Sequence, residues 1–309
     1  MTKIAEMPSG GASGVIYFGT PEIAVGPLEE LVANSCNVRL VVTRPDVRRG
    51  RGNEVTPSPV KVAARKLGLT VVHTVEPAIE MARNEKSLLG VVVAYGELFK
   101  TDILEALPMI NVHFSLLPRW RGAAPVERAI LAGDKKTGVC IMRVVEKLDE
   151  GEIYGSQETL IADNEDADSL RLRLVELSRG MLVEKVQNGC GFGSAQSGEA
   201  VYAKKIKPDD LEINWQNSAE QVLRQVRVGG AFTWVNTKRL KVAGARISES
   251  TSPIGGPGSI CLMNSESCVV ATGDGCVALE RVQPEGKSVM SIEVWLNGAR
   301  LDAQTQFGK

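Results

Sequence analysis

The first half of the chain alternates strand-like and helix-like segments, and this alternation limits the possible folds more than any other feature of the sequence. Short apolar runs rich in β-branched residues recur at 15–18, 38–43, 70–73, 88–94 and 110–114. Helical patterns separate them, including one at 58–67 and one that starts at Thr20-Pro21-Glu22, where Thr20 is the expected N-cap. This alternation is typical of parallel strands joined by crossover helices. We therefore predict an α/β fold with a Rossmann-like, doubly wound parallel sheet.

The pattern changes after residue 136. Two strand-like segments, 137–145 and 152–161, flank the turn Asp149-Glu150-Gly151, and 166–186 has the pattern of a long amphipathic helix. A Gly- and Ser-rich stretch, 187–198, is typical of a linker. Further strand-like segments then occur at 235–242, 258–263, 268–272 and 277–282. We expect a flexible N-terminus 1–14, an α/β domain 15–188, a linker 189–203 and a small OB-like β-barrel domain 204–309.

Composition argues against several classes of protein. The six cysteines form no CxxC pair and only His73 and His113 could assist them, so we expect no metal site, no disulfide framework and a reducing compartment. No apolar run approaches about 18 residues, and the first residues lack the apolar segment of a signal peptide. We therefore expect a cytoplasmic protein without a membrane span. The first glycine turn, Phe18-Gly19-Thr20-Pro21, is not GxGxxG, which argues against NAD binding.

A stripe of polar residues runs along one face of the strand-like segment at 110–114. Asn111, His113 and Ser115 share one face of this strand, which is expected to be apolar on both faces in a sheet of this class. One explanation is an ordinary core histidine whose polar neighbours are satisfied by adjacent loops. The spacing and the position at the strand's C-terminal end favour a functional site instead. An amide and an imidazole suit a carbonyl whose oxygen becomes negative, as in acyl transfer.

Asp149 is the candidate carboxylate for orienting His113. It follows a strand-like segment that is expected to pair beside the site. Asp-x-Gly sequences also form turns without any catalytic role. The residues alone leave both interpretations of Asp149 open.

A family resemblance adds to these observations. The stretch Asn111-Val-His113-Phe-Ser115-Leu-Leu-Pro118, followed by Leu148-Asp149-Glu-Gly151, resembles the active-site signature of the 10-formyltetrahydrofolate-dependent formyltransferases. Stretches similar to the methionyl-tRNA formyltransferase branch of this family span nearly the whole chain in order, at 18–22, 51–52, 57–62, 93–96, 117–126 and 271–275.

The resemblance implies a site, a co-substrate and a partner. Asn111, His113 and Asp149 are the implied catalytic trio, and no metal is implied. The implied co-substrate is 10-formyltetrahydrofolate, contacted by Ala94, Tyr95, Gly96, Leu98, Ser115, Leu116, Leu117 and Pro118. The implied partner is initiator methionyl-tRNA, and we expect the protein to be a monomer.

Local charge agrees with an anionic partner. The formal net charge of the chain is −1, yet eight basic residues and only two acidic ones lie in 39–66. The resemblance places the tRNA acceptor stem at this loop, with Arg44, Arg48, Arg49, Arg51 and Lys61 as implied contacts. The alternative is a solvated loop with exposed arginines. The sequence also departs from the family here, since Asn53-Glu54 stands where many relatives have two lysines.

Three other functions share parts of this pattern. A formyltransferase acting on a small amine, such as glycinamide ribonucleotide or a nucleotide-linked amino sugar, would have the same trio. A formyltetrahydrofolate hydrolase would also keep the trio, but it has no need of the basic loop. An RNA-binding barrel attached to an inactive α/β domain would not need Asn111, His113 and Asp149 intact.

Overall fold

The chain forms two compact units. The computed structural model describes residues 4–49, 54–248, 255–302 and 304–308. The N-terminal unit takes in the chain up to Val126, then Lys136–Leu160 and Leu170–Lys204. The C-terminal unit takes in Glu127–Lys135, Ile161–Ser169 and the chain from Lys205 onward. Within the described ranges, no helix is long and apolar enough to cross a membrane.

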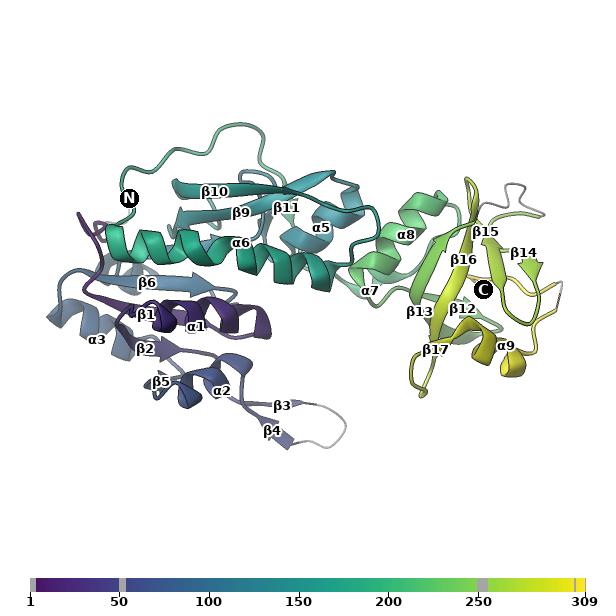
Figure 1. The fold of residues 1–309 in the computed structure, drawn as a ribbon, viewed down its shortest axis with the longest axis horizontal. Coiled ribbons are helices and arrows are strands. Elements are labelled where there is room, and N and C mark those ends of the chain that lie inside the picture. Colours follow the sequence, from purple (N-terminus) through teal and green to yellow (C-terminus); the bar gives the residue numbers. More distant parts are fainter. Residues whose placement is uncertain (1–3, 50–53, 249–254, 303, 309) are drawn as a thin grey trace. The chain divides into compact units, whose positions relative to one another are not determined.

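A twisted sheet organises the N-terminal unit (Figure 1). Its strand order is β10 (Ile153–Leu160), β9 (Lys136–Arg143), β7 (Met109–His113), β6 (Leu88–Val93), β1 (Gly14–Gly19), β2 (Val38–Val42) and β5 (Val71–Val72). The strands from β7 to β5 are parallel, as predicted. β9 runs antiparallel to β7, and β10 runs antiparallel to β9, to which the segment 144–152 joins it. The sheet is therefore mixed, and the predicted α/β class is confirmed.

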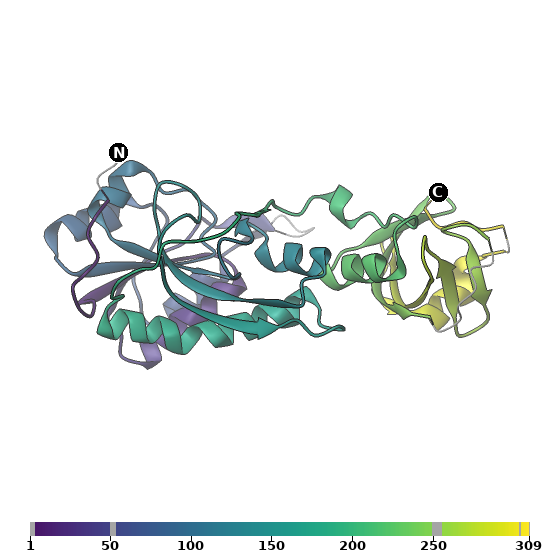
Figure 2. The same cartoon turned by 90° about the horizontal axis from the view of Figure 1, so that it is seen from above.

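Helices lie on both sides of this sheet (Figure 2). They are α1 (Val25–Ala33), α2 (Pro59–Lys66), α3 (Glu76–Asn84), α4 (Thr101–Ala106) and α6 (Ala167–Asn188). Helix α5 (Pro125–Ala132) belongs mostly to the C-terminal unit. The side chain of Ser58 caps α2 by accepting from the Lys61 amide, and Pro59 opens the helix. The helix start predicted at Thr20 is wrong: a 3₁₀ turn, Glu22–Ala24, precedes α1, and the Thr20 hydroxyl bonds the Tyr95 carbonyl instead.

Within the described residues, the N-terminal unit also contains two short strand pairs outside its main sheet. β3 (Val47–Arg49) and β4 (Glu54–Thr56) form a two-stranded hairpin in the segment predicted to be a basic loop. β8 (Arg121–Gly122) pairs in parallel with β11 (Tyr202–Ala203). The second pair joins two loops that are far apart in the sequence, and it becomes important for the site.

An antiparallel curled sheet forms the core of the C-terminal unit, in keeping with the predicted small barrel. Its strands are β12 (Phe232–Val235), β13 (Lys238–Ile247), β14 (Ile260–Met263), β15 (Cys268–Ala271), β16 (Cys276–Pro284) and β17 (Met290–Ser291). Helices α7 (Pro208–Leu211), α8 (Ala219–Val228) and α9 (Ile292–Ala299) accompany them. The strand predicted at 235–242 is observed from Lys238 onward, as part of β13. Asn236 and Thr237 adopt left-handed conformations, with φ of 48° and 63°, and reverse the chain between β12 and β13.

An ion pair within the C-terminal unit gives a pH-dependent prediction. The guanidinium of Arg128 donates to both carboxylate oxygens of Asp210 at 2.8 and 2.9 Å, and these bonds hold the pKa of Asp210 below its ordinary value of 3.8. The stabilisation is therefore complete above pH 3.8 and is lost as the pH falls through the lowered pKa. We expect the difference in urea midpoint between the wild type and Asp210→Asn to be constant from pH 7 to pH 5 and to shrink at more acidic pH. A difference that grows on acidification would contradict this sign.

Candidate active site

The predicted polar stripe lies at the end of a central strand. β7 lies between β6 and β9, with Asn111 opposite Met142 and His113 opposite Cys140 on β9. His113 is only 5% exposed, and Ser115 directly after the strand is fully buried. The stripe is thus positioned by sheet pairing on both sides, at the carboxyl edge of the parallel strands.

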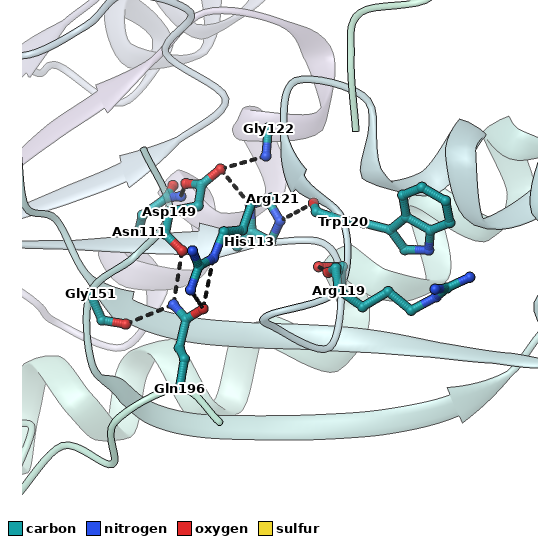
Figure 3. A network of polar contacts seen from close by, with 10 residues as sticks. Asn111, His113, Arg119, Trp120, Arg121, Gly122, Asp149, Gly151 and Gln196 are labelled. Atoms are coloured by element: carbon teal, nitrogen blue, oxygen red, sulfur yellow. Dashed lines mark hydrogen bonds and ion pairs between the residues drawn. The ribbon is translucent and has the colours of Figure 1, made fainter. Parts of the chain in front are cut away.

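The turn after β9 brings Asp149 to this stripe. Asp149 adopts a left-handed conformation, with φ of 54°, which aspartate tolerates better than most residues. Its Oδ2 accepts from the Gly122 amide at 2.8 Å and lies 3.6 Å from His113 Nδ1. Its Oδ1 accepts from Asn111 Nδ2 at 3.4 Å. The structure therefore gathers the three predicted catalytic side chains into one cluster (Figure 3).

The other nitrogen of His113 faces a backbone carbonyl. Nε2 lies 2.9 Å from the carbonyl oxygen of Trp120, and since a carbonyl can only accept, Nε2 carries a proton in this arrangement. Trp120 itself is left-handed, with φ of 65°. The Ser115 hydroxyl donates to the Arg119 carbonyl at 2.6 Å, so it closes the same loop. Ser115 thus helps to hold the loop that carries Trp120 in place.

A cavity of about 480 Å³ opens beside the trio. Asn111, His113 and Asp149 line it together with apolar and backbone-rich segments at 92–99, 122–125 and 142–148. The rings of Tyr95 and Phe99 stack with centroids 5.5 Å apart, and burial raises the pKa of Tyr95 to about 12. A largely apolar cavity of this size with a few convergent polar groups is typical of a site for a small organic molecule.

The residues predicted to contact folate fall into two groups. Ala94, Tyr95, Gly96 and Leu98 line the cavity, and left-handed conformations at Ala94 and Gly96 turn the chain around it. None of the residues from Ser115 to Pro118 lines the cavity, although the preceding residue Phe114 does. Leu117 packs against Cys140 and Met142 instead. In this structure the second group shapes the loop behind the trio.

Two glycines permit the close approaches at the site. Gly122 has φ of 118°, and a Cβ there would lie 2.8 Å from the Ala203 carbonyl oxygen. At Gly151 a Cβ would lie 1.9 Å from the Arg143 carbonyl oxygen. Both positions therefore exclude any larger residue without movement of the backbone.

Sequence reasoning missed several residues that hold the trio. The Gly122 amide, the Trp120 carbonyl and the side chain of Gln196 all contact the site or the turn that carries Asp149. Two of these contacts use backbone groups, and because nearly every residue has the same backbone groups, the sequence carries no signal for them. Gln196 lies in a stretch whose composition predicted only a linker.

The basic segment has both exposed and buried members. Arg44 is exposed and forms an ion pair with Glu97 at 3.3 Å. Lys61 is only 6% exposed, and its ammonium lies 2.6 Å from Asp46 Oδ2 and 3.1 Å from His73 Nε2. Arg48 and Arg49 belong to β3, and Arg51 lies outside the described residues.

Comparisons with known proteins agree with the geometry. The model of the family described as "Formyl transferase" matches residues 14–186, and "Formyl transferase, C-terminal domain" matches residues 205–300. A Symbiobacterium thermophilum protein named Methionyl-tRNA formyltransferase is 37% identical, with 95% of this chain and 94% of that protein covered.

Solved structures show the same fold. Methionyl-tRNA formyltransferase from Clostridium thermocellum aligns with a TM-score of 0.57 at 17% identity, covering 77% of this chain and 95% of that one. An N-formyltransferase from Helicobacter canadensis, in complex with folinic acid and dTDP-3-aminofucose, aligns with a TM-score of 0.64 at 17% identity, covering 87% and 98%. With both family models matched and the trio assembled, the chain belongs to the formyl transferase family.

Proposed function

We propose that this protein transfers the formyl group of 10-formyltetrahydrofolate to the α-amino group of methionyl-initiator-tRNA. The observation that carries the proposal is the cluster of Asn111, His113 and Asp149 at the wall of an apolar cavity. Relatives that match almost the full length of the chain at 37% and 38% identity are named Methionyl-tRNA formyltransferase, which supports the choice of acceptor.

The cavity suits the folate. The ring of Phe99, which is partly exposed and stacks on the buried Tyr95, offers aromatic surface for a planar ring, and the turn through Ala94 and Gly96 offers peptide groups for its polar edge. When bound, the folate supplies an activated formyl group on N10. The residues of the chain then have to orient that group, stabilise the developing charge and manage a proton.

The trio divides these tasks. The free amine of the methionyl group attacks the formyl carbon, and the carbonyl oxygen becomes negative. Asn111 Nδ2 and the protonated Nε2 of His113 are the donors available to that oxygen, once Nε2 exchanges the Trp120 carbonyl for it. Asp149 fixes the imidazole and assists the movement of the amine's proton toward the departing N10. Holding two large substrates in register contributes much of the remaining acceleration.

The direct test compares three acceptors. Labelled formyl transfer from 10-formyltetrahydrofolate would be measured to initiator methionyl-tRNA, elongator methionyl-tRNA and glycinamide ribonucleotide. We expect rapid transfer to the initiator alone. Transfer only to the small acceptor would retain the chemistry but reject the tRNA assignment, and formate release without an acceptor would indicate a hydrolase.

The basic segment provides a prediction about tRNA binding. A triple variant in which Arg48, Arg49 and Arg51 are all replaced by alanine is expected to raise KM for methionyl-tRNA roughly tenfold. The reason is that interactions with phosphates supply most nucleic-acid affinity. The slope of log KM against log salt is expected to fall by about one for each arginine–phosphate interaction that the substitutions remove. Arg39→Ala is the matched control, since Arg39 is held by Glu85 at 2.7 and 2.9 Å. An unchanged KM and salt slope in the triple variant would reject this loop as the tRNA site.

Lys61 belongs to the same proposal in a different role. Its ammonium is enclosed by Asp46 and His73, and His73 Nδ1 lies 3.0 Å from the Thr43 carbonyl oxygen. We propose that Lys61 fixes the segment leading to β3 and so supports the arginines that contact tRNA.

A further inference from the structure

The stretch Ser194–Ala203, which we call the strap, lies along two loops of the active site. Ser194 exchanges both backbone hydrogen bonds with Ile153, at the start of β10. Further along, the Val201 carbonyl accepts from the Arg121 amide at 2.9 Å, and the Ala203 carbonyl accepts from the Ala123 amide at 3.0 Å. The strap is therefore paired to other parts of the chain at both of its ends.

One side chain of the strap joins the two loops to each other. Gln196 Nε2 donates to the carbonyl oxygens of Asp149 and Gly151, both at 2.8 Å. Its Oε1 accepts from Nε and Nη2 of Arg121 at 3.0 and 2.7 Å (Figure 3). Arg121 Nη1 in turn lies 3.1 Å from Glu150 Oε1. The primary amide of glutamine can donate two hydrogen bonds through its nitrogen and accept two through its oxygen, so one side chain makes all four of these contacts.

The contact acts on the backbone that aims the catalytic carboxylate. Asp149 is left-handed, and within its turn the Glu150 amide reaches the Lys147 carbonyl only at 3.4 Å. The two bonds from Gln196 fix the peptide groups at Asp149 and Gly151, and those peptide planes set the direction of the Asp149 side chain. Arg121, the other partner of Gln196, directly precedes Gly122, whose amide donates to Asp149 Oδ2 at 2.8 Å. Gln196 therefore holds both the residue that carries the carboxylate and the loop that supplies its hydrogen-bond donor.

We propose that Gln196 is a positioning residue for the formyl transfer: it fixes the Asp149 turn against the Arg121–Gly122 loop and so keeps the carboxylate in register with His113 and Asn111. The proposal rests on the proposed function of the trio. Gln196 does not line the cavity, so its effect is on the geometry of the reacting groups and not on the binding of the folate.

Three variants test the proposal. Gln196→Ala removes both sets of hydrogen bonds, and it is expected to lower kcat by roughly 10- to 100-fold, because misplacement of a catalytic group by about 1 Å has effects of that size. Gln196→Glu keeps acceptor oxygens for Arg121 but lacks the donor to the two carbonyls, so we expect a similar decrease in kcat. Gln187→Ala is the control, because Gln187 also donates to a backbone carbonyl, that of Asn34 at 2.8 Å, away from the site.

The readout separates positioning from stability and binding. We expect KM for 10-formyltetrahydrofolate and for methionyl-tRNA to change by less than about twofold in both Gln196 variants, so that the effect appears in kcat. Thermal unfolding, measured on the same samples, corrects for any unfolded fraction. An unchanged kcat in Gln196→Ala, an effect confined to KM, or full activity of Gln196→Glu would each overturn the proposal. Wild-type protein that transfers no formyl group would instead reject the proposed function itself.

Discussion

His113→Gln is expected to lower kcat for formyl transfer by about 10²- to 10⁴-fold, with little change in KM for either substrate. The imidazole is nearly buried and lies 3.6 Å from Asp149 Oδ2, and its protonated Nε2 lies 2.9 Å from the Trp120 carbonyl oxygen. Glutamine fills similar space and can donate hydrogen bonds, but its amide cannot take up and release a proton as an imidazole can. Single-turnover transfer from 10-formyltetrahydrofolate to methionyl-tRNA measures the chemical step directly.

The chain supplies its own control for this experiment. His73 is the only other histidine, and it bonds Lys61 and the Thr43 carbonyl rather than the trio. His73→Gln is expected to leave kcat unchanged. Asp149→Asn retains an oxygen that can accept from the Gly122 amide but removes the negative charge beside His113, and its kcat should fall with that of His113→Gln. If His113→Gln stayed within about tenfold of the wild type, general acid–base and oxyanion roles for this imidazole would be untenable.

Gly122→Val is expected to have the second large effect, on both stability and turnover. The backbone at Gly122 has φ of 118°, and a Cβ there would approach the Ala203 carbonyl oxygen to 2.8 Å. Strain and crowding together should cost about 2–4 kcal/mol of unfolding free energy. Separation of β8 from β11 would also displace the amide that donates to Asp149, and kcat should fall roughly 10²-fold.

A second glycine shows whether this effect is specific. Gly180 lies in α6 with open space around it, so Gly180→Ala should raise the unfolding free energy by about 0.4–1 kcal/mol and leave kcat unchanged. Urea denaturation and steady-state kinetics on both variants complete the comparison. Equal behaviour of the two substitutions would show that the conformation of Gly122 has no role in the site.

The central parts of the fold and the trio could be predicted because their signals are local. Asn111 and His113 share one strand face, and the apolar runs that became β1, β6 and β7 each contain a continuous strand signal. Asp149 was ambiguous from its own neighbours. The antiparallel pairing of β7 with β9 brings the turn after β9, and with it Asp149, to the stripe.

The remaining contacts depend on chain segments that meet only in the folded protein. Gln196 reaches Asp149 across 47 positions and Arg121 across 75, and no periodicity in the sequence records such contacts. Its Gly- and Ser-rich surroundings indicate flexibility when taken alone. Backbone pairing with Ile153, Arg121 and Ala123 gives the stretch a fixed path, and backbone groups leave no mark in the amino-acid composition. The hairpin at Asn236 and Thr237 was missed because neither residue is glycine.

The pairing of the strap also determines where this chain can change length. The first family model matches up to residue 186 and the second begins at residue 205. By this division the residues between them belong to neither domain and would be taken for a linker of variable length. Around Phe192, whose side chain is fully exposed, an insertion alters no described hydrogen bond. Between Val201 and Ala203 an insertion breaks the register of the backbone bonds with the Arg121 loop. A change in length is therefore compatible with the described contacts around Phe192 and disrupts them within Val201–Ala203, so the segment paired to the Arg121 loop extends beyond the first family match to Ala203.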